Sequence, residues 1–178
     1  VDGHFHGEDA WYGIRKKSKP ALAQIMGAKD GEVVAMNNLS VNLHLLMVSF
    51  YRPTSSRYKI LVEAGAFPSD QYMLETQLKF HGLNPSDALV EIHPREGEYT
   101  LRTEDIEAEI QRQGDALAMV NMSGIQYYTG QFFDIQRITQ AAHGVGAVAG
   151  FDLAHAAGNV PMKLHDWQVD FATWCSYK

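Results

Sequence analysis

Four residues of different chemical types lie where strands are expected to end or a helix is expected to begin. Lys178 follows one expected strand, Asp152 follows another, and Phe67 lies in a turn after a third. Ser40 stands at the start of an apolar helical stretch. An aldehyde cofactor that captures amino acids needs a Schiff-base lysine, an acid for its ring nitrogen, a flat side chain on its ring and donors for its phosphate. The free N–H groups and dipole of a helix N-terminus suit a phosphate.

Each of these residues also has a plainer explanation when taken alone. A lysine just after a strand is usually solvated, and Asp152 could only cap the turn that follows it. Phe67 could be a core residue, and Ser40 could be an N-cap and nothing more. The functional interpretation therefore depends on finding all four in one chain.

From residue 31 onward, short apolar runs, such as the one at 33–36, alternate with amphipathic stretches. This alternation is typical of βαβ units, whose strands and helices must position the four residues. Strands are predicted at 58–64, 116–122, 145–151 and 169–175, and helices at 41–51, 71–80, 101–113 and 135–143. This pattern predicts an α/β fold of three layers, with helices on both faces of a mostly parallel sheet. Ser123, Asp152 and Lys178 then fall at the carboxyl ends of strands, where such sheets bind ligands.

Residues 1–30 are predicted to form a helical lead-in, and residues 31–178 a larger cofactor-binding domain. The chain lacks an initiator methionine and stops directly after a strand-like run. We therefore expect an internal piece of a longer polypeptide, truncated after the candidate lysine.

Composition narrows the class of protein. The 178 residues are 46% hydrophobic and 20% charged, with a formal net charge of -6. A net negative charge argues against nucleic acid as a partner, and the short basic cluster at 15–19 is interpreted as a solvated helix face. A single cysteine, Cys175, favours a reducing compartment and hence the cytoplasm. No apolar run approaches the ~18 residues of a membrane span.

Two other motifs lack the context that their chemistry requires. Gly144, Gly146 and Gly150 resemble a dinucleotide loop, but they lie before or within a strand rather than at a helix start, so close packing is expected instead. The histidines His4, His6 and His93 have no cysteine or carboxylate partners at ligand spacing. No metal is expected.

Five strings in order resemble the kynureninase family, fold-type-I pyridoxal-phosphate enzymes related to the class V aminotransferases. They are Asn-Leu-His-Leu-Leu-Met at 42–47, Phe-Pro-Ser-Asp at 67–70, Tyr-Thr-Gly-Gln at 128–131, Phe-Asp-Leu-Ala-His-Ala at 151–156 and Trp-Cys-Ser-Tyr-Lys at 174–178. The resemblance runs from about Gly3 to Lys178. The string at 151–156 is shared with relatives such as cysteine desulfurases, whereas the whole set is more specific.

The resemblance implies a role for each matching position. Lys178 would form the Schiff base and shuttle protons, Asp152 would pair with the pyridinium nitrogen, and Tyr128 would assist as an acid or base. His4 matches a substrate-pocket histidine. The cofactor-binding positions would be Leu39, Ser40, Phe67, Pro68, Ser69, Asp70, Ser123, Asp152, His155, Tyr177 and Lys178.

The implied reaction is the hydrolysis of L-kynurenine, or 3-hydroxykynurenine, to the anthranilate and L-alanine in tryptophan catabolism or NAD biosynthesis. The family acts as a homodimer with the active site at the interface. Its substrate-carboxylate arginine comes from sequence beyond Lys178.

Two other functions remain open at this point. One is a cysteine desulfurase or related lyase, although such enzymes commonly carry His before the lysine, where this chain has Tyr177, and need their cysteine on a loop. The other is a non-catalytic α/β module that binds a phosphate or a protein.

Overall fold

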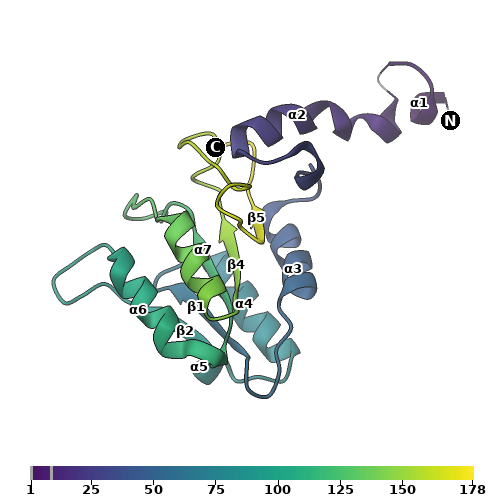
Figure 1. The fold of residues 1–178 in the computed structure, drawn as a ribbon. Coiled ribbons are helices and arrows are strands. Elements are labelled where there is room, and N and C mark those ends of the chain that lie inside the picture. The colour runs from purple at the N-terminus through teal and green to yellow at the C-terminus, as the bar shows by residue number, and fades with distance from the viewer. Residues whose placement is uncertain (1, 9) are drawn as a thin grey trace.

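A parallel sheet of five strands forms the centre of the protein (Figure 1). The computed structural model describes residues 2–8 and 10–178. The strand order is β2-β1-β3-β4-β5, and every neighbouring pair is parallel. The strands are β1 (Lys59–Glu63), β2 (Leu89–Ile92), β3 (Leu117–Ser123), β4 (Val148–Asp152) and β5 (Phe171–Thr173). The three-layer α/β prediction is confirmed.

Helices cover both faces of this sheet, and a separate hydrophobic cluster lies under each face. One cluster contains residues of α3 (Leu39–Phe50), α4 (Pro68–Phe80) and α5 (Pro85–Ala88). The other contains residues of α6 (Thr103–Gln113) and α7 (Ile135–Gly144). Short 3-10 turns lie at Trp11–Gly13, Asp30–Glu32 and Gly114–Ala116.

Alternation along the strands explains why both faces need cover. On β1, Leu61 belongs to one cluster, and its neighbours Ile60 and Val62 belong to the other. Successive side chains of a strand point to opposite faces, so a strand buried on both sides is apolar almost throughout. The uninterrupted apolar runs of this sequence are the direct result.

The N-terminal segment extends from the main body (Figure 1). It contains α1 (Asp2–Phe5) and α2 (Arg15–Met26), and it joins the core at the end of α2, where Ala23 and Met26 are buried. Gly27 ends α2 with a φ of 57°. A Cβ there would lie 2.3 Å from the carbonyl oxygen of Met162, so only glycine allows this close approach.

Most predicted elements are present, with shifted ends. The β2 strand was not predicted, because its four residues are too short a run for a recognisable pattern. Residues 33–36 form no strand, and the predicted strand at 169–175 is only three residues long. Gly150 provides the expected close packing, since a Cβ on it would overlap the ring of Phe171.

Ser40, which from the sequence could have been the N-cap of α3, does not cap it. The N-cap is Asn38, whose Oδ1 accepts a hydrogen bond from the Val41 N–H at 3.0 Å. Asparagine and serine are about equally good caps, so residue type alone could not choose between positions 38 and 40. Ser40 lies instead within the first turn of the helix.

Among the described residues, no helix has the length and apolarity that crossing a membrane requires.

One arginine joins three segments at the amino-terminal edge of the sheet. The Arg57 Nη1 donates hydrogen bonds to the carbonyl oxygens of Leu117 at 2.6 Å and Val145 at 2.8 Å. Its Nη2 lies 3.3 Å from the Asp115 carboxylate. Arg57 thus ties the segment before β1 to the start of β3 and to the loop before β4.

We expect Arg57→Met to destabilise the full-length protein by about 2 kcal/mol, because hydrogen bonds from a charged donor contribute about that much and two carbonyls lose their partner. Urea denaturation measures the change. Arg52→Met is the matched control, since Arg52 makes an exposed bond to Ser49 three residues away. Equal midpoints for the two variants would contradict the role given to Arg57.

Candidate active site

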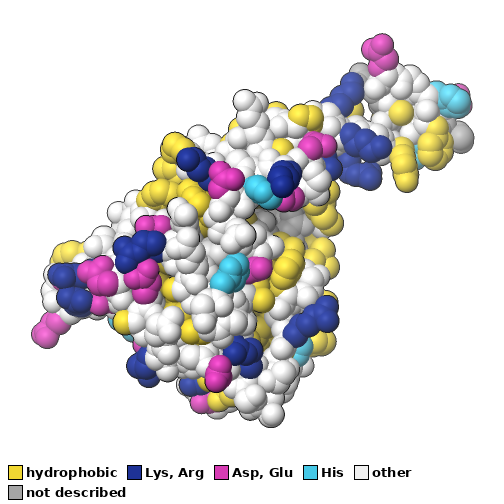
Figure 2. Space-filling view, viewed as in Figure 1, with side chains coloured by type: hydrophobic (Ala, Val, Ile, Leu, Met, Phe, Trp, Pro, Cys, Tyr) yellow, Lys and Arg dark blue, Asp and Glu magenta, His cyan; other side chains and the backbone are white. Residues whose placement is uncertain are grey.

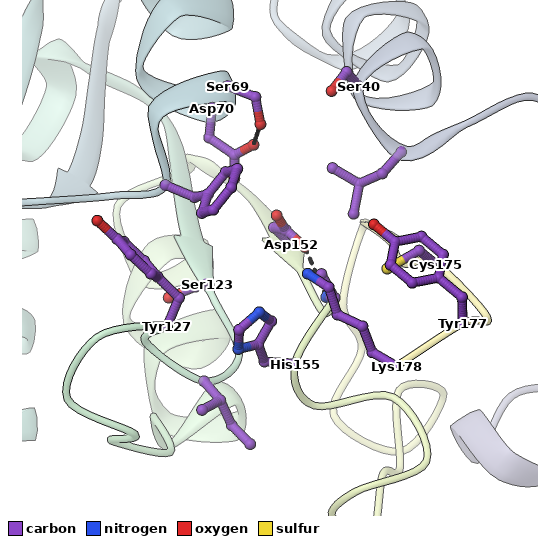
Figure 3. Close-up of a pocket in the computed structure, with 14 residues that line it drawn as sticks. Ser40, Ser69, Asp70, Ser123, Tyr127, Asp152, His155, Cys175, Tyr177 and Lys178 are labelled. Atoms are coloured by element: carbon purple, nitrogen blue, oxygen red, sulfur yellow. Dashed lines mark hydrogen bonds between the residues drawn. The ribbon is translucent and has the colours of Figure 1, made fainter.

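A pocket of about 250 Å³ opens at the carboxyl end of the sheet (Figure 3). Its walls come from strand ends, two helix N-termini, the loop after β3 and the C-terminal residues. The lining residues are Leu39, Ser40, Phe67, Ser69, Asp70, Ser123, Ile125, Tyr127, Asp152, Ala154, His155, Cys175, Tyr177 and Lys178.

Two strand ends form the floor of this pocket. Ser123 ends β3 and Asp152 ends β4, and the two residues are partners in the parallel register. The N–H of Gly124 donates to the carbonyl oxygen of Asp152 at 2.7 Å, so the pairing continues past the ends of the strands. The two polar side chains are therefore held beside each other by backbone hydrogen bonds.

Asp152 is a buried carboxylate with a fixed orientation. It is 7% exposed, and its Oδ1 accepts a hydrogen bond from the Ala154 N–H at 2.7 Å. The turn-capping bond considered from the sequence therefore exists. A carboxylate in this position can also bind a cationic group that enters the pocket, so capping and ligand binding are compatible.

The Asp70 carboxyl group lies close to Asp152 and has an unusual proton affinity. The pKa of Asp70 is raised to about 8, chiefly by burial and secondly by the nearby charge of Asp152. The Ser69 hydroxyl donates to its Oδ1 at 3.2 Å, which acts in the opposite direction. Asp70 is consequently neutral over much of the range in which an exposed aspartate is charged.

The N-termini of α3 and α4 both reach the pocket. Leu39 and Ser40 form the first turn of α3, and Ser69 and Asp70 belong to the first turn of α4. The first N–H groups of a helix lack partners within the helix and carry a partial positive charge. This side of the pocket is therefore suited to an anion such as a phosphate.

Two aromatic rings form another wall. The rings of Phe67 and Tyr127 meet edge to face, with centroids 5.2 Å apart and planes at 83°. The Lys178 Nζ lies 5.9 Å from the centroid of Phe67. Lys178 points into the pocket, so a flat ligand against Phe67 would come within reach of the amine (Figure 3).

A buried amide, Gln126, holds the loop that carries Tyr127. Its Nε2 donates to the carbonyl oxygen of Gly65 at 2.8 Å, and its Oε1 accepts from the N–H groups of Tyr128 and Thr129. Gly65 lies just before Phe67 in the chain. Gln126 therefore connects the two loops whose aromatic rings meet in the wall.

The C-terminal residues complete the lining. Tyr177 is 81% exposed, and a hydrogen bond with Cys175 raises its pKa. Both residues line the pocket together with His155 from the turn after β4. Among the described residues, no group of three His, Cys, Asp or Glu side chains is arranged to hold a metal ion.

Most of the residues predicted from the sequence meet in this pocket, and three do not. Ten of the eleven cofactor positions line it, the exception being Pro68, which is the first residue of α4. Tyr128 is 86% exposed, and its neighbour Tyr127 takes the lining position. His4 packs against Trp11 in the N-terminal segment, with ring centroids 5.2 Å apart.

Sequence reasoning missed four lining residues, namely Ile125, Tyr127, Ala154 and Cys175. Tyr127 could have been found, because it shares the Tyr-Tyr pair from which Tyr128 was chosen. Ile125 and Ala154 have no distinguishing chemistry. Cys175 was judged to lie in a strand, but β5 ends at Thr173 and leaves it free to turn toward the pocket.

Comparison with known sequences finds one family and many close relatives. Residues 8–178 match the aminotransferase class-V family. A kynureninase from Flavobacterium psychrophilum is 58% identical over 178 residues, which are 100% of this chain and 42% of the relative. A kynureninase from Nematostella vectensis is 57% identical over the same 178 residues, 38% of its length. The chain thus spans less than half the length of these curated relatives.

Solved structures confirm the fold. A cysteine desulfurase from Thermococcus onnurineus superposes with a TM-score of 0.77 at 20% identity, covering 97% of this chain and 41% of the other. A second structure, of a C-DES variant with glycine linked to its PLP cofactor, has a TM-score of 0.73 at 13% identity, with coverages of 89% and 40%.

We expect the raised pKa of Asp70 to make the stability of the unliganded full-length protein fall as pH rises from about 4 to about 8. In this window the folded state holds a proton that the unfolded state has released, so the slope of the unfolding free energy against pH is negative, at most about 1.4 kcal/mol per unit. Asp70→Asn removes this titration. Urea denaturation at several pH values should give a flatter profile for the variant; two parallel profiles would contradict the assignment.

Proposed function

The chain belongs to the aminotransferase class-V family, and on that premise we propose that the protein is a pyridoxal-phosphate enzyme that hydrolyses L-kynurenine to anthranilate and L-alanine. The observation that carries the proposal is the meeting of Lys178, Asp152 and Phe67 in one pocket of a chain that is 58% identical to a kynureninase. Each of the three meets a separate need of this cofactor.

The donor set of the pocket fits pyridoxal phosphate. The N-termini of α3 and α4, with the Ser40 hydroxyl, suit its phosphate. Phe67 offers a flat face to its ring, and Asp152 offers a buried carboxylate to its ring nitrogen. Lys178 supplies the amine that would hold the cofactor. Positive and negative ends of the cofactor would thus find complementary partners on different sides of the pocket.

When bound, pyridoxal phosphate acts as an electron sink for the bonds around the α-carbon of an amino acid. The residues of the chain would direct that chemistry. Asp152 favours the cationic form of the ring nitrogen, because an opposite charge nearby raises its pKa. Lys178, displaced by the substrate amine, would move a proton at the α-carbon. Tyr177 and His155, which line the pocket, would orient the ring.

Tyr128 and His4 do not line the pocket of the single chain, so their proposed roles require a second subunit. Tyr128, our candidate acid–base helper, is exposed beside the pocket, and His4 lies in the extended N-terminal segment. A second subunit is the partner we propose for both, because it would cover the residues that a single chain leaves exposed. We also propose that residues 1–30 are a helical lead-in and that residues 31–178 are the cofactor-binding unit.

A homodimer is supported by the outer face of α3. Val41, Leu45 and Val48 on this helix are 44%, 48% and 64% exposed, and the helix presents apolar residues on nearly every side. Figure 2 shows hydrophobic side chains gathered over this region and along the N-terminal segment. An apolar patch of this kind marks an interface.

The single cysteine supports a cytoplasmic location.

A cysteine desulfurase is the second candidate, since Cys175 lines the pocket. The sequence comparison favours kynureninase, because the kynureninases are 57% and 58% identical to this chain and the desulfurase only 20%.

We expect Lys178→Ala to lose the visible absorption band of the parent protein and to form anthranilate from L-kynurenine at least about 100-fold more slowly, since the proton-transfer group is gone. The full-length protein is used for both measurements. Lys163→Ala, at an exposed lysine outside the pocket, is the matched control and should behave as the parent.

Two results would overturn the assignment in different ways. A parent protein without a cofactor band would end the pyridoxal-phosphate proposal. A band without anthranilate formation would keep the cofactor and shift the proposal to the desulfurase. Asp152→Asn separates binding from chemistry, because it should retain cofactor but lose most of its turnover.

For the dimer, we expect Val48→Glu to convert the full-length protein to a monomer, because a carboxylate would be buried without a partner in the interface. Analytical ultracentrifugation measures the mass. Phe80→Glu is the control, since Phe80 is 77% exposed at the far end of α4. If Val48→Glu stays dimeric and only unfolds more easily, the remainder of the same chain covers α3 instead.

A further inference from the structure

Three carboxyl groups are buried at the carboxyl end of the sheet, and one of them has no part in the site described above. Glu63 ends β1 and is 2% exposed, Asp70 in α4 is 4% exposed, and Asp152 at the end of β4 is 7% exposed. None of the ion pairs found among residues 2–8 and 10–178 includes any of the three. Their mutual arrangement does not suit a metal ion.

Only neutral groups donate hydrogen bonds to these carboxyl groups in the described structure. Glu63 accepts from the Ser123 hydroxyl at 2.5 Å and from the Ser123 N–H at 3.2 Å. Asp70 accepts from the Ser69 hydroxyl, and Asp152 from the Ala154 N–H. Neutral donors favour a carboxylate, but they do not cancel its charge. Three buried negative charges at one site are strongly disfavoured, so protons must remain.

The proton affinities agree with this reasoning. The pKa of Asp70 is raised to about 8 by burial, by the charge of Asp152 and, more weakly, by the charge of Glu63. Burial also raises the pKa of Glu63, and the charge of Asp152 adds to the effect. The other titratable groups that face this region are Tyr127, His155, Cys175, Tyr177 and Lys178. Of these, Lys178 is the residue with an amine, and it is exposed (Figure 3).

We propose that Glu63, Asp70 and Asp152 form a proton-holding cluster that keeps at least one proton at neutral pH in the cofactor-free protein and releases it when the cationic ring of the cofactor binds. The carboxyl O–H bond breaks, the proton passes to solvent, and the carboxylate that remains faces the ring cation. The release step rests on the proposed function. Glu63 acts as a positioning residue, because it touches Ser123 and influences the ring only through the cluster.

This cluster couples cofactor binding to pH. Where the cluster is protonated, binding must displace a proton, and so the affinity for cofactor rises with pH until the cluster is ionised.

Carbon-13 NMR of full-length protein labelled at the aspartate carboxyl carbons tests the proposal. The resonance that disappears in Asp70→Asn reports Asp70. In cofactor-free protein we expect its midpoint near pH 8, and in protein loaded with pyridoxal phosphate we expect a midpoint lower by at least about one unit. A midpoint near the ordinary value of about 4 without cofactor would overturn the cluster, and an unchanged midpoint on loading would overturn the release step.

Glu63→Gln tests the contribution of the third carboxyl group. It removes one negative charge at nearly constant shape, so the Asp70 midpoint of the cofactor-free protein should shift to lower pH. Glu91→Gln makes the same change at an exposed position of β2 and should leave the midpoint in place. Equal midpoints in the two variants would remove Glu63 from the cluster.

Ser123→Ala serves as a second variant if Glu63→Gln does not fold, which circular dichroism shows. Without the serine hydroxyl, Glu63 holds its own proton more tightly and repels Asp70 less, so the midpoint again falls; no shift argues against the role of Glu63. The titration of cofactor-free protein needs no cofactor. A protein that binds no pyridoxal phosphate would therefore refute the proposed function while still reporting whether the cluster exists.

Discussion

The parallel pairing of the five strands is the constraint on which the rest of the structure depends. In a parallel sheet the carboxyl ends of all strands lie at the same end of the sheet, so Glu63, Ser123 and Asp152 meet there. In the sequence, Ser123 is 60 residues after Glu63, and Asp152 is 29 residues after Ser123. Parallel strands also require crossover connections, which are usually helices, and these helices bury both faces of the sheet. The same arrangement that forms the core therefore gathers the polar strand ends into one pocket.

Charge is distributed in this pocket by backbone structure as much as by side chains. The N-termini of α3 and α4 give one side a partial positive character. The strand ends on the other side carry the buried carboxyl groups of Glu63 and Asp152, and Asp70 in the first turn of α4 lies close to Asp152. Burial raises the pKa values of Asp70 and Glu63. A ligand with an anionic group at one end and a cationic ring at the other would match this separation, as pyridoxal phosphate does.

Side chains donate hydrogen bonds to, and accept them from, backbone groups of the polar loops around the pocket. Gln126 bridges the loop of Tyr127 and the turn before Phe67, and Gln131 exchanges hydrogen bonds with both backbone groups of Leu101. Gln126 is buried and Gln131 is half-buried. The sequence does not distinguish such bridging glutamines from glutamines on the surface. Neither residue could have been recognised without the structure.

The sequence by itself determined the fold class, the main strands and helices, and the candidates Lys178, Asp152 and Phe67. Periodicity and residue type are local properties that can be read along the chain. Only the tertiary structure decided that Tyr127 rather than Tyr128 lines the pocket and that Asn38 rather than Ser40 caps α3. It alone brought Glu63 to Asp70 and Asp152. The proton affinity of a carboxyl group depends on its neighbours in space and on its burial, and the sequence alone specifies neither of them directly.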